Sequence, residues 1–449
     1  MRKKRTPKKR NSKNKHPMKM KRTTGMMRRK LREPRLKNSH RYRQAYQDAL
    51  VELNGSPSTS TDYDEVYAPV ARLTTIRTLL SVIHENNLHE MQMDVKNAFL
   101  HGKLKETIYM KVPDGINGKD GLVCKLNRSL YDLKQAPRVW NERFDTFVKG
   151  IHFKQSPHDC CLYIKIQNGT KIYLLLYVDD IILAGDDKTT LDQVTAALKR
   201  EFSMSDLGEL RNFLGMSITR NDNEMALSQF GYIKKLLTRF GVQDCKANVN
   251  EKQWVEVKRM LRYLKDTQQF GLIYRRQTAP VLAAYADSDW AGSLDRKSTT
   301  GFLLQVHGNV VCWSTKKQNT VALSSTEAEY VALACAAAEL VWLRNLLRDM
   351  HVTYEDSTIM FEDNQSCIHL LSKYEHRRMK HLDVKYHLIR DLAISKIIDV
   401  KYIPSNEQRA DILTKGLPRT THGLEGLTKF VGTSFLCPRR VHIYGEGIG

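Results

Sequence analysis

The sequence has no long uncharged apolar run of the kind that a membrane-spanning helix requires. Such a helix needs about 20 apolar residues, and no uncharged stretch of this 449-residue chain approaches that length. The basic N-terminus also lacks the apolar core of a secretory signal peptide. We therefore do not expect a membrane protein or a secreted one.

Cysteine pairs at disulfide or zinc spacing are also absent. The eight cysteines are scattered, and Cys160 and Cys161 are adjacent rather than two residues apart. His376, His381 and His387 have no accompanying cysteine pair and no i,i+4 histidine pair, so a zinc site is not predicted. We expect reduced thiols in an intracellular protein and, around the histidines, a basic helix that faces nucleic acid or solvent.

Acidic residues are almost missing from the first 47 residues. This segment has 20 Lys and Arg and a single acid, Glu33, so it carries +19 of the net +23 and leaves about +4 for the rest. Few large apolar residues and strong self-repulsion predict a disordered tail that is attracted to phosphate. Two explanations of this tail are open. KKRTPKKR could be a nuclear-localisation signal, or the tail could be a solvated charge run that results from translation of sequence outside the original reading unit.

Two adjacent acids, Asp179 and Asp180, interrupt the apolar segment LLLYVDDIILAG. Two apolar runs around an acidic pair are typical of two buried strands joined by a turn. Aspartates are common in such turns for conformational reasons alone. Repulsion between the carboxylates would be costly without a cation, however, and magnesium or manganese is the cation that oxygen ligands indicate.

A third carboxylate, Asp94, ends a short strand in QMDVKNAFLHG, and Phe99 follows five residues later. Two metal ions that activate a primer hydroxyl and stabilise the leaving pyrophosphate need carboxylates from separate segments. Asp94 with Asp179 and Asp180 meets that requirement.

The second half of the chain supplies four more acids on successive predicted elements. Three strand-like runs form a meander, and Ser324 to Glu327 have capping-box spacing before a long apolar helix. A strand that ends at Asp363 and a later helix follow. Each acid alone is better explained as a surface or helix-start residue, but their order is informative. They are Asp287, Glu329, Asp363 and Asp411.

The motifs MDVKNAFL, SLYDLKQAPRVW, LLYVDDIILAG and FLGMSI resemble, in this order, the palm of copia-type LTR-retrotransposon reverse transcriptases. The four later acids resemble the ribonuclease H that is fused behind that polymerase. The resemblance extends over about 63–248 and about 254–418. It implies an α/β (α+β) fold with polymerase palm and fingers, a truncated thumb and a ribonuclease H-like domain.

The resemblance also implies roles for individual residues. Phe99 would lie under the deoxynucleotide sugar, although a core position explains it equally well, and Gln135 would belong to the nucleotide-binding turn. Phe213 to Gly215 resemble the segment that positions the primer end. Each active site would hold two Mg²⁺ (or Mn²⁺) ions on catalytic carboxylates: Asp94, Asp179 and Asp180 in the polymerase, and Asp287, Glu329, Asp363 and Asp411 in the ribonuclease H.

Three departures from the family pattern bear on activity. A basic fingers segment is replaced by HRYRQAYQDALVELNGSPSTS, which leaves Arg72 and Arg77 as the nearest cations for a triphosphate. Asp132 stands where the family has a glycine in a tight turn, and its charge would repel phosphate. Between Lys246 and Trp254 the chain also lacks a long thumb and connection stretch, which should weaken its hold on template and primer.

We therefore predict a basic tail and linker (1–60), a reverse transcriptase (61–248), a short helical connector (249–278), a ribonuclease H-like domain (279–420) and a C-terminal tail (421–449). The predicted function is RNA-directed DNA polymerase with ribonuclease H. RNA template, DNA primer, RNA/DNA hybrid and deoxynucleoside triphosphates would be its partners, in cytoplasmic virus-like particles and in the nucleus through the tail. A noncatalytic nucleic-acid-binding protein or a decayed retroelement remnant is the alternative.

Overall fold

The computed structural model describes residues 67–112, 123–241, 252–276, 279–292, 294–372, 383–415 and 435–436. The predicted N-terminal tail, most of the predicted C-terminal tail, and His376 and His381 therefore lie outside the described residues. His387 is exposed on a helix. The six cysteines within the described ranges are free thiols, as predicted.

The first half of the chain contains a six-stranded sheet with the strand order β4-β5-β6-β7-β1-β8. Every neighbouring pair of strands in it is antiparallel. Its strands, in chain order, are β1 (His89–Val95), β4 (Lys154–Gln155), β5 (Leu162–Gln167), β6 (Thr170–Tyr177), β7 (Asp180–Gly185) and β8 (Met204–Gly208). The apolar segment around the acidic pair is therefore two strands and a turn, as predicted.

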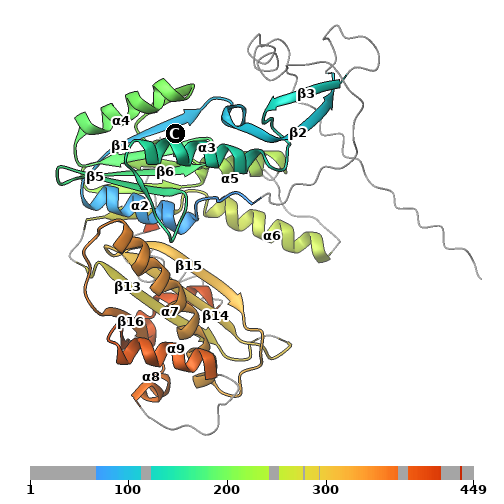
Figure 1. The fold of residues 1–449 in the computed structure, drawn as a ribbon. Helices are drawn as coiled ribbons and strands as arrows, with labels where there is room; N and C mark the ends of the chain where they lie inside the picture. Colours follow the sequence, from blue (N-terminus) through green and yellow to red (C-terminus); the bar gives the residue numbers. More distant parts are fainter. Residues whose placement is uncertain are drawn as a thin grey trace, which may run out of the picture. The chain divides into compact units, whose positions relative to one another are not determined.

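Helices cover both faces of this sheet (Figure 1). They are α2 (Leu73–Glu85) on one face, and α3 (Ala136–Gly150) and α4 (Lys188–Glu201) on the other. Alternate residues of β6 pack into the two cores, with Leu174 against the α3 side and Leu175 against the α2 side. Burial on both faces explains why these strands are almost continuously apolar. The 3-10 helix η1 (Ala98–His101) and the hairpin β2 (Lys103–Lys111) and β3 (Val123–Arg128) follow β1.

A second, five-stranded sheet has the order β18-β12-β11-β10-β9. Its strands are β9 (Asn212–Phe213), β10 (Met216–Arg220), β11 (Glu224–Ser228), β12 (Gly271–Arg275) and β18 (Phe435–Leu436). Two helices, α5 (Phe230–Arg239) and α6 (Lys252–Asp266), lie between β11 and β12 in the chain. Because β12 pairs with β11, the chain on both sides of the shortened segment contributes to one sheet.

Two sequence predictions are corrected by this sheet. The region 249–278 is not purely helical, since it contains β12 as well as the predicted helix α6. The C-terminal segment contributes β18, which pairs with β12. Both strands are short, and their pairing partners are far away in the sequence, so local patterning gave no sign of them.

The third sheet has the order β15-β14-β13-β16-β17. The antiparallel meander β13 (Leu282–Asp289), β14 (Thr299–Val306) and β15 (Asn309–Lys317) is confirmed. The strands β16 (Thr358–Glu362) and β17 (Ile398–Tyr402) add in parallel. The remaining elements are α7 (Ser325–Asp349), α8 (Gln365–Ser372), α9 (Asp383–Ile394), η3 (Ser405–Glu407) and η4 (Arg409–Leu413).

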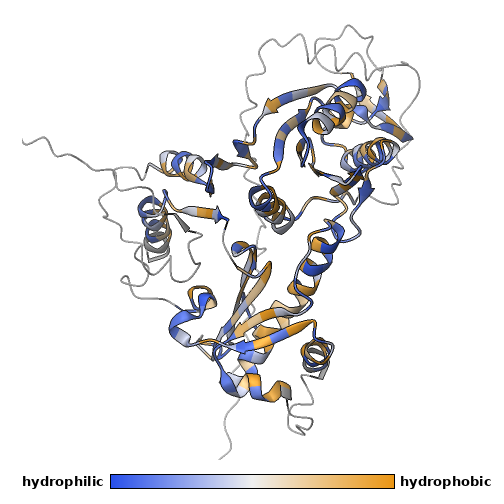
Figure 2. Cartoon of the chain, turned by 90° about the vertical axis from the view of Figure 1, so that its left-hand side faces the viewer, coloured by the Kyte–Doolittle hydropathy of each residue, from blue (hydrophilic) through white to orange (hydrophobic). Residues whose placement is uncertain are grey.

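Helix α7 is the only described helix long and apolar enough to cross a membrane by length and composition. In the structure 67% of its most apolar window is buried, and its apolar residues belong to the core that covers the third sheet. In the hydropathy view, apolar and polar residues are interspersed along the helices of the chain (Figure 2). Packing against the sheet accounts for its composition.

Arg72 and Arg77, the predicted substitutes for the missing fingers cations, have other partners. The Arg72 guanidinium lies 4.4 Å from the ring centre of Trp342, and that of Arg77 lies 4.1 Å from the ring centre of Trp313. Ser81 on the same helix donates a 2.9 Å hydrogen bond to the Val306 carbonyl. These arginines stabilise packing between α2 and the third-sheet region, which argues against a role on a triphosphate.

We expect Ser324→Ala to destabilise the protein, because the Ser324 hydroxyl accepts a hydrogen bond from the Glu327 amide at the start of α7. Loss of an N-cap costs about 1 kcal/mol. Chemical denaturation monitored by circular dichroism measures the change in unfolding free energy. Ser325→Ala is the matched control, since that exposed neighbour makes no such cap. Equal stability of the two variants would contradict the assigned cap.

Candidate active sites

Three acids of the second half of the chain lie together at the ends of different elements. Asp287 is on β13, Glu329 is in the second turn of α7, and Asp363 follows β16 directly. One carboxylate oxygen of each lies within 4.8 Å of the others. Asp287 and Glu329 are buried, whereas Asp363 is partly exposed. The structure thus brings together three of the four acids predicted for this half as a compact group.

The fold explains why these acids meet. The strands β13 and β16 are parallel neighbours with Tyr285 opposite Phe361, so Asp287 and Asp363 each follow that pair by two residues. Helix α7 is fixed at its start by the Ser324 cap and by Gln318, whose side-chain amide donates to the Ala328 carbonyl at 2.9 Å. This anchor holds the next residue, Glu329, over the strand ends.

Burial and mutual repulsion raise the pKa values of the group. Burial is the main cause that raises the pKa of Asp287 to about 6, against opposing effects from Thr414 and Lys415. Burial first, and then the charges of Glu362, Asp287 and Asp363, raise the pKa of Glu329 to about 10. Without a bound cation, the site therefore favours the protonated state of its buried members.

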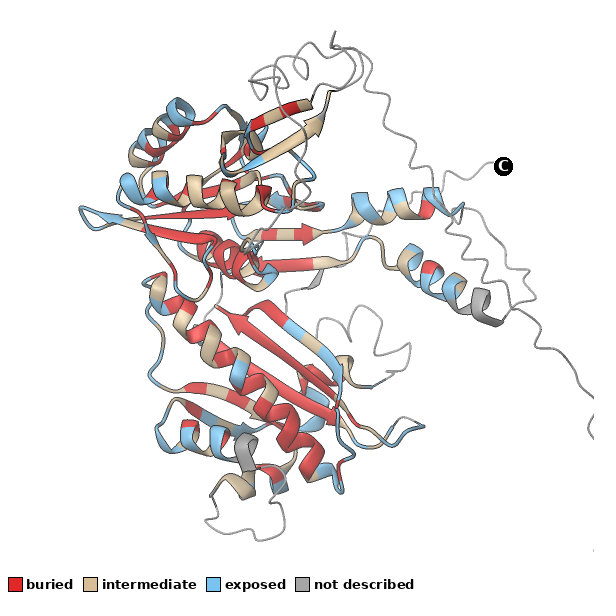
Figure 3. Ribbon diagram, turned by 45° about the vertical axis from the view of Figure 1, so that its right-hand side comes forward, coloured by how far each residue is buried: buried red, intermediate tan, exposed pale blue. Residues whose placement is uncertain are grey.

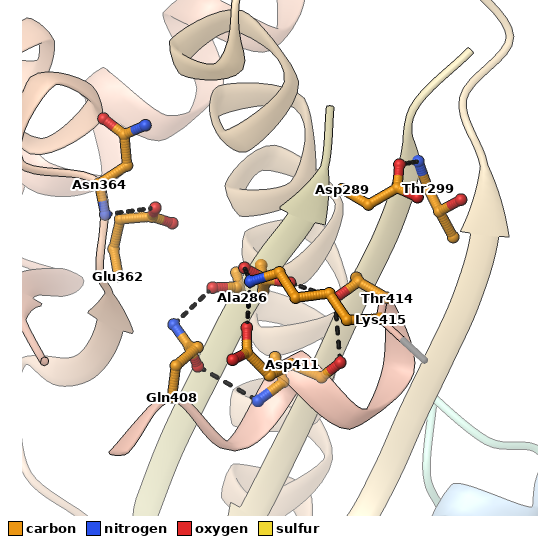
Figure 4. A network of polar contacts seen from close by, with 11 residues as sticks. Ala286, Asp289, Thr299, Glu362, Asn364, Gln408, Asp411, Thr414 and Lys415 are labelled. Carbon is orange, nitrogen blue, oxygen red and sulfur yellow. Dashed lines mark hydrogen bonds and ion pairs between the residues drawn. The ribbon is translucent and has the colours of Figure 1, made fainter. Parts of the chain in front are cut away.

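Glu362 is an additional acid that the sequence analysis missed. Alternation along a strand puts neighbouring side chains on opposite faces, which would separate Glu362 from Asp363. The Glu362 side chain is nevertheless fully buried, and it accepts a 3.1 Å hydrogen bond from the Asn364 backbone amide (Figure 4). Burial raises the pKa of Glu362 well above its usual value, with the charges of Asp363 and Asp287 adding to the effect. The adjacent acids in FEDN were the available signal.

The fourth predicted acid, Asp411, lies beside Asp287 but faces a cation from its own chain. The Lys415 ammonium lies 2.5 Å from an Asp411 oxygen and 3.2 Å from an Asp287 oxygen, and the Thr414 hydroxyl donates to Asp287. Figure 4 shows these side chains converging from the η4 segment onto β13. Asp411 is in a helix, as predicted, and this helix is of the 3-10 type.

Gln408 fastens this segment to the sheet. Its side chain is completely buried, donates to the Ala286 carbonyl at 2.9 Å and accepts from the Ala410 amide at 3.2 Å. Gln408, Thr414 and Lys415 were not among the predicted site residues. The i,i+4 spacing of Asp411 and Lys415 was a usable signal for the ion pair.

The group fits a divalent metal ion by its chemistry. Among the described residues, the buried oxygens Glu329 Oε2 and Glu362 Oε2 have no hydrogen-bond partner, and an orphaned buried carboxylate oxygen is costly unless a cation or proton satisfies it. All three clustered ligands are carboxylates, which suit the hard cations Mg²⁺ and Mn²⁺.

The three acids of the first half are also neighbours. Asp94 on β1 is the antiparallel partner of Asp180 on β7, and the Val95 amide donates to the Asp179 carbonyl at 2.8 Å. Burial, followed by the charge of Asp179, raises the pKa values of Asp94 and Asp180. In the described ranges only the group around Asp287 brings three potential ligand atoms within 4.8 Å, so these acids are less tightly convergent.

The turn that carries Asp179 is strained and held from outside. Val178 has φ 59°, which is a rare conformation for a β-branched residue. Trp140 on α3, part of the SLYDLKQAPRVW motif, donates a 2.6 Å hydrogen bond from its indole to the Val178 carbonyl. Trp140 thus positions the turn, a role that the sequence analysis missed.

The predicted nucleotide-binding residues lie on the segments that follow β1 and precede α3. Phe99 is half-buried, with its ring centre 4.7 Å from that of Tyr131, so both predicted roles stay open. Gln135 is buried at the N-cap position of α3. Asp132 has φ 75°, which shows that aspartate adopts the left-handed turn for which glycine is better suited.

The segment predicted to position the primer end forms a tight turn. Leu214 and Gly215, with φ 50° and 77°, join β9 to β10. Phe213 is buried, and its ring centre lies 6.5 Å from that of Tyr177, directly before the strained turn. The second sheet thus contacts the β6–β7 hairpin at this point.

Comparisons with known proteins agree with these features. A family model described as reverse transcriptase (RNA-dependent DNA polymerase) matches residues 35–251. The Pol polyprotein of transposon TNT 1-94 from Nicotiana tabacum is 36% identical over 83% of this chain and 33% of its own length. That of transposon RE1 from Arabidopsis thaliana is 33% identical over 84% of this chain and 30% of its own length.

The chain belongs to the copia-type retrotransposon Pol family. It is thereby a member of a reverse transcriptase enzyme family, and it spans about a third of the length of these curated relatives. A solved foamy viral protease-reverse transcriptase in complex with RNA/DNA hybrid is 14% identical over 71% of this chain and 44% of that chain, with a TM-score of 0.42. The family assignment rests on the sequence relatives.

The pKa values of this copia-type chain predict an unusual pH dependence of stability. Asp287 and Glu329 have folded-state pKa values of about 6 and about 10, above the values of unfolded carboxyls. At pH values between the unfolded-state and folded-state pKa values, the native state binds more protons than the unfolded state. The stability of the metal-free protein should therefore fall as pH rises from about 4.5 toward 10.

Thermal unfolding in a chelator across this pH range, with parent and Glu329→Gln compared, measures the effect. The variant should lose part of the decline above pH 6, because its amide does not ionise, whereas the buried carboxyl of Glu362 with its raised pKa remains. A parent and variant with parallel pH profiles would contradict the shifted pKa of Glu329.

We expect Lys415→Met to bind Mn²⁺ about tenfold more tightly than the parent. The ammonium neutralises Asp287 and Asp411, and its loss leaves their charge for the metal. Titration calorimetry on the folded chain measures the affinity. Lys415→Arg, which keeps the charge, should stay near the parent. Equal Mn²⁺ affinity for the Met and Arg variants would contradict competition between Lys415 and the metal.

Proposed function

We propose that this chain is an RNA-directed DNA polymerase with ribonuclease H activity, which uses divalent metal ions at both sites. The observation that carries the proposal is the convergence of Asp363 with the buried acids Asp287 and Glu329. Family membership supports the polymerase chemistry. The geometry supports hydrolysis of the RNA strand in a hybrid better than polymerisation, because the first-half carboxylates converge less closely.

In the hydrolytic site, Asp287, Glu329, Asp363 and Asp411 would hold the ions. Bound Mg²⁺ or Mn²⁺ supplies a metal-activated water and stabilises negative charge on the phosphate. Asp363 is the most accessible of the three clustered acids, so it is the carboxylate on the solvent side from which a phosphate would approach. Hydrogen bonds from Gln408 and Thr414 hold the η4 segment against β13 next to Asp287. Lys415 neutralises part of the site's negative charge.

In the polymerase site, Asp94, Asp179 and Asp180 would hold the ions for primer extension with deoxynucleoside triphosphates. Trp140 fixes the turn that presents Asp179, and a rigid turn lowers the reorganisation needed when ions bind. Phe99 would favour deoxynucleotides by crowding a 2′-hydroxyl. Arg72 and Arg77 stack on tryptophans, so triphosphate neutralisation at this site depends on the metal ions and on cations elsewhere.

Cleavage of a labelled RNA/DNA hybrid in Mg²⁺ tests the hydrolytic half. Asp363→Asn removes a ligand charge and should lower the cleavage rate at least about a hundredfold. Asp399→Asn is the control, because Asp399 is an exposed acid on β17 that forms an ion pair with Lys401. Cleavage that survives in Asp363→Asn would point to a contaminating nuclease or to a wrong site.

Extension of a labelled DNA primer on an RNA template tests the other half. The parent should extend the primer in Mg²⁺, and Asp179→Asn should abolish extension without changing hybrid cleavage. Absence of extension by a folded parent that still binds and cleaves the hybrid would show a decayed polymerase beside a working ribonuclease H.

A noncatalytic nucleic-acid-binding function is the second candidate, favoured by the +19 charge of residues 1–47. It predicts that deletion of this segment removes binding and its steep salt dependence, whereas substitutions of the core acids change binding little. Equally salt-sensitive binding after the deletion would exclude it.

A further inference from the structure

A cavity of about 380 Å³ lies where the first-half sheet meets the end of helix α7. One side is lined by residues of β4, β5 and the segments next to them, and the other by the residues around the end of α7. Helix α7 is buried or intermediate along most of its length, and Arg348 is one of its few exposed residues (Figure 3). The volume of this junction cavity is within the range of small-molecule sites, about 300 to 1000 Å³. None of the acids of the two candidate active sites lines it.

Hydrogen bonds across the junction hold the walls of the cavity in place. The Ser156 hydroxyl donates to an Asp349 carboxylate oxygen at 2.5 Å, and the same oxygen lies 2.8 Å from His158 Nδ1. The buried Tyr173 donates from its hydroxyl to the Met350 carbonyl at 2.8 Å. Because both walls are fixed by these bonds, a ligand would enter a preformed site and would not have to order it.

Basic groups surround the junction cavity. Lys154 and Arg348 are exposed lining residues, and neither forms an ion pair with a described residue. The Lys171 ammonium lies 2.8 Å from the carbonyl of His351, which is also a lining residue. Among the described lining residues Asp349 is the only acid, and its carboxylate already has the hydrogen bonds described above. The cavity is therefore complementary to an anion.

Two histidines that line the cavity stand where helix ends favour glycine. His152 follows α3 and His351 follows α7, with φ of 70° and 54°. In each case the next residue, Phe153 or Val352, donates from its amide to the carbonyl five positions earlier, at 3.2 and 3.0 Å. Glycine is the usual residue at this left-handed position, because a side chain is strained there. Strain at both positions indicates that the imidazoles serve the cavity and not the fold.

One wall of the junction cavity is apolar. Ile164 and Ile166 are two residues apart on β5, so they share a face of the strand. Ile164 is buried, whereas Ile166 is 49% exposed and Pro157 is exposed beside the cavity. A bare inorganic anion would leave this wall in water. An anion that is carried on a planar ring would cover the wall and meet the cations at the same time.

We propose that the junction cavity binds a nucleoside that carries a terminal phosphate. Lys154 and Arg348 hold the phosphate. The imidazoles of His152 and His351 donate hydrogen bonds to its oxygens, and the base lies against Ile166. Since the ligand contacts both the first-half sheet and the end of α7, its binding stabilises the junction between them. The proposal is independent of the proposed catalytic function.

Isothermal titration calorimetry of the full chain with adenosine 5′-monophosphate, in a chelator, tests the site. The chelator removes nucleotide binding through metal ions at the acidic sites. The nucleotide should bind at least about tenfold more tightly than adenosine or ribose 5-phosphate, because each of these fragments lacks one of the two kinds of contact. Equal affinity for the nucleotide and for adenosine would overturn the proposal.

The double variant Lys154→Gln, Arg348→Gln should bind the nucleotide at least about tenfold more weakly than the parent, with adenosine binding unchanged. The control is Arg200→Gln, Lys396→Gln, which removes the same charge from exposed positions that do not line the cavity. An effect of total charge alone would be equal in the two variants. Equal nucleotide affinity in both would overturn the proposed site.

The double variant His152→Gly, His351→Gly separates binding from folding. Glycine relieves the left-handed strain, so the unfolding midpoint should stay the same or rise. Nucleotide affinity should fall at least about threefold, because two donors are lost. Unchanged affinity in this variant would contradict the role of the imidazoles, since a loss of folding cannot explain the result.

The phosphate can come from a free nucleotide or from the end of an RNA strand, and two further probes distinguish these sources. They are a 5′-phosphorylated RNA tetranucleotide and the same strand without the phosphate. Tighter binding of the phosphorylated strand than of the mononucleotide, lost in Lys154→Gln, Arg348→Gln, would identify a strand end as the ligand. Weaker binding of that strand than of the mononucleotide would identify the free nucleotide.

Discussion

Repulsion among buried carboxylates is the constraint on which the arrangement of the second half depends. Asp287, Glu329 and Asp363 place oxygens within 4.8 Å of one another, and Glu362 adds a further buried acid. Such a group destabilises the fold unless protons, metal ions or a fixed cation compensate it. Among the described residues, Lys415 forms ion pairs with Asp287 and Asp411 and compensates part of this charge. The rest of the charge is left to protons or ions, which is why the same feature weakens the fold and suits it to phosphoryl chemistry.

Much of this arrangement could be predicted because each local signal agreed with the global fold. The Ser324 cap, the meander and the acidic turn between apolar strands all appear in the structure. Alternation along a strand puts Glu362 and Asp363 on opposite faces of the sheet, so it did not predict that both acids lie at the site. The strand β16 ends at Glu362, and the backbone beyond a strand end no longer follows the alternating pattern. Lys415 escaped prediction because a lysine on the surface is the ordinary expectation for that residue.

Long-range pairing was the other limit of the sequence. The strand β12 follows the shortened segment and pairs with β11, which precedes it, and no local property of GLIYR specifies that partner. The same limit applied to Arg72 and Arg77, whose tryptophan partners are far away in the chain. Charge alone suggested phosphate for these arginines. In the folded protein these arginines lie over tryptophan rings instead, because a guanidinium is attracted to an aromatic face as well as to an anion.

Both candidate sites bring carboxylates together, but they differ in how firmly the surrounding fold holds those carboxylates in place. The acids of the proposed hydrolytic site come from a strand, a helix and a strand end that are fixed by buried side chains such as Gln408 and Gln318. The acids of the proposed polymerase site lie on one hairpin and on the strand beside it, and their turn depends on a strained Val178 held by Trp140. A strained turn persists only where its surroundings hold it. Changes around α3 should therefore damage the polymerase site sooner than comparable changes damage the hydrolytic one, which is the more redundantly supported of the two.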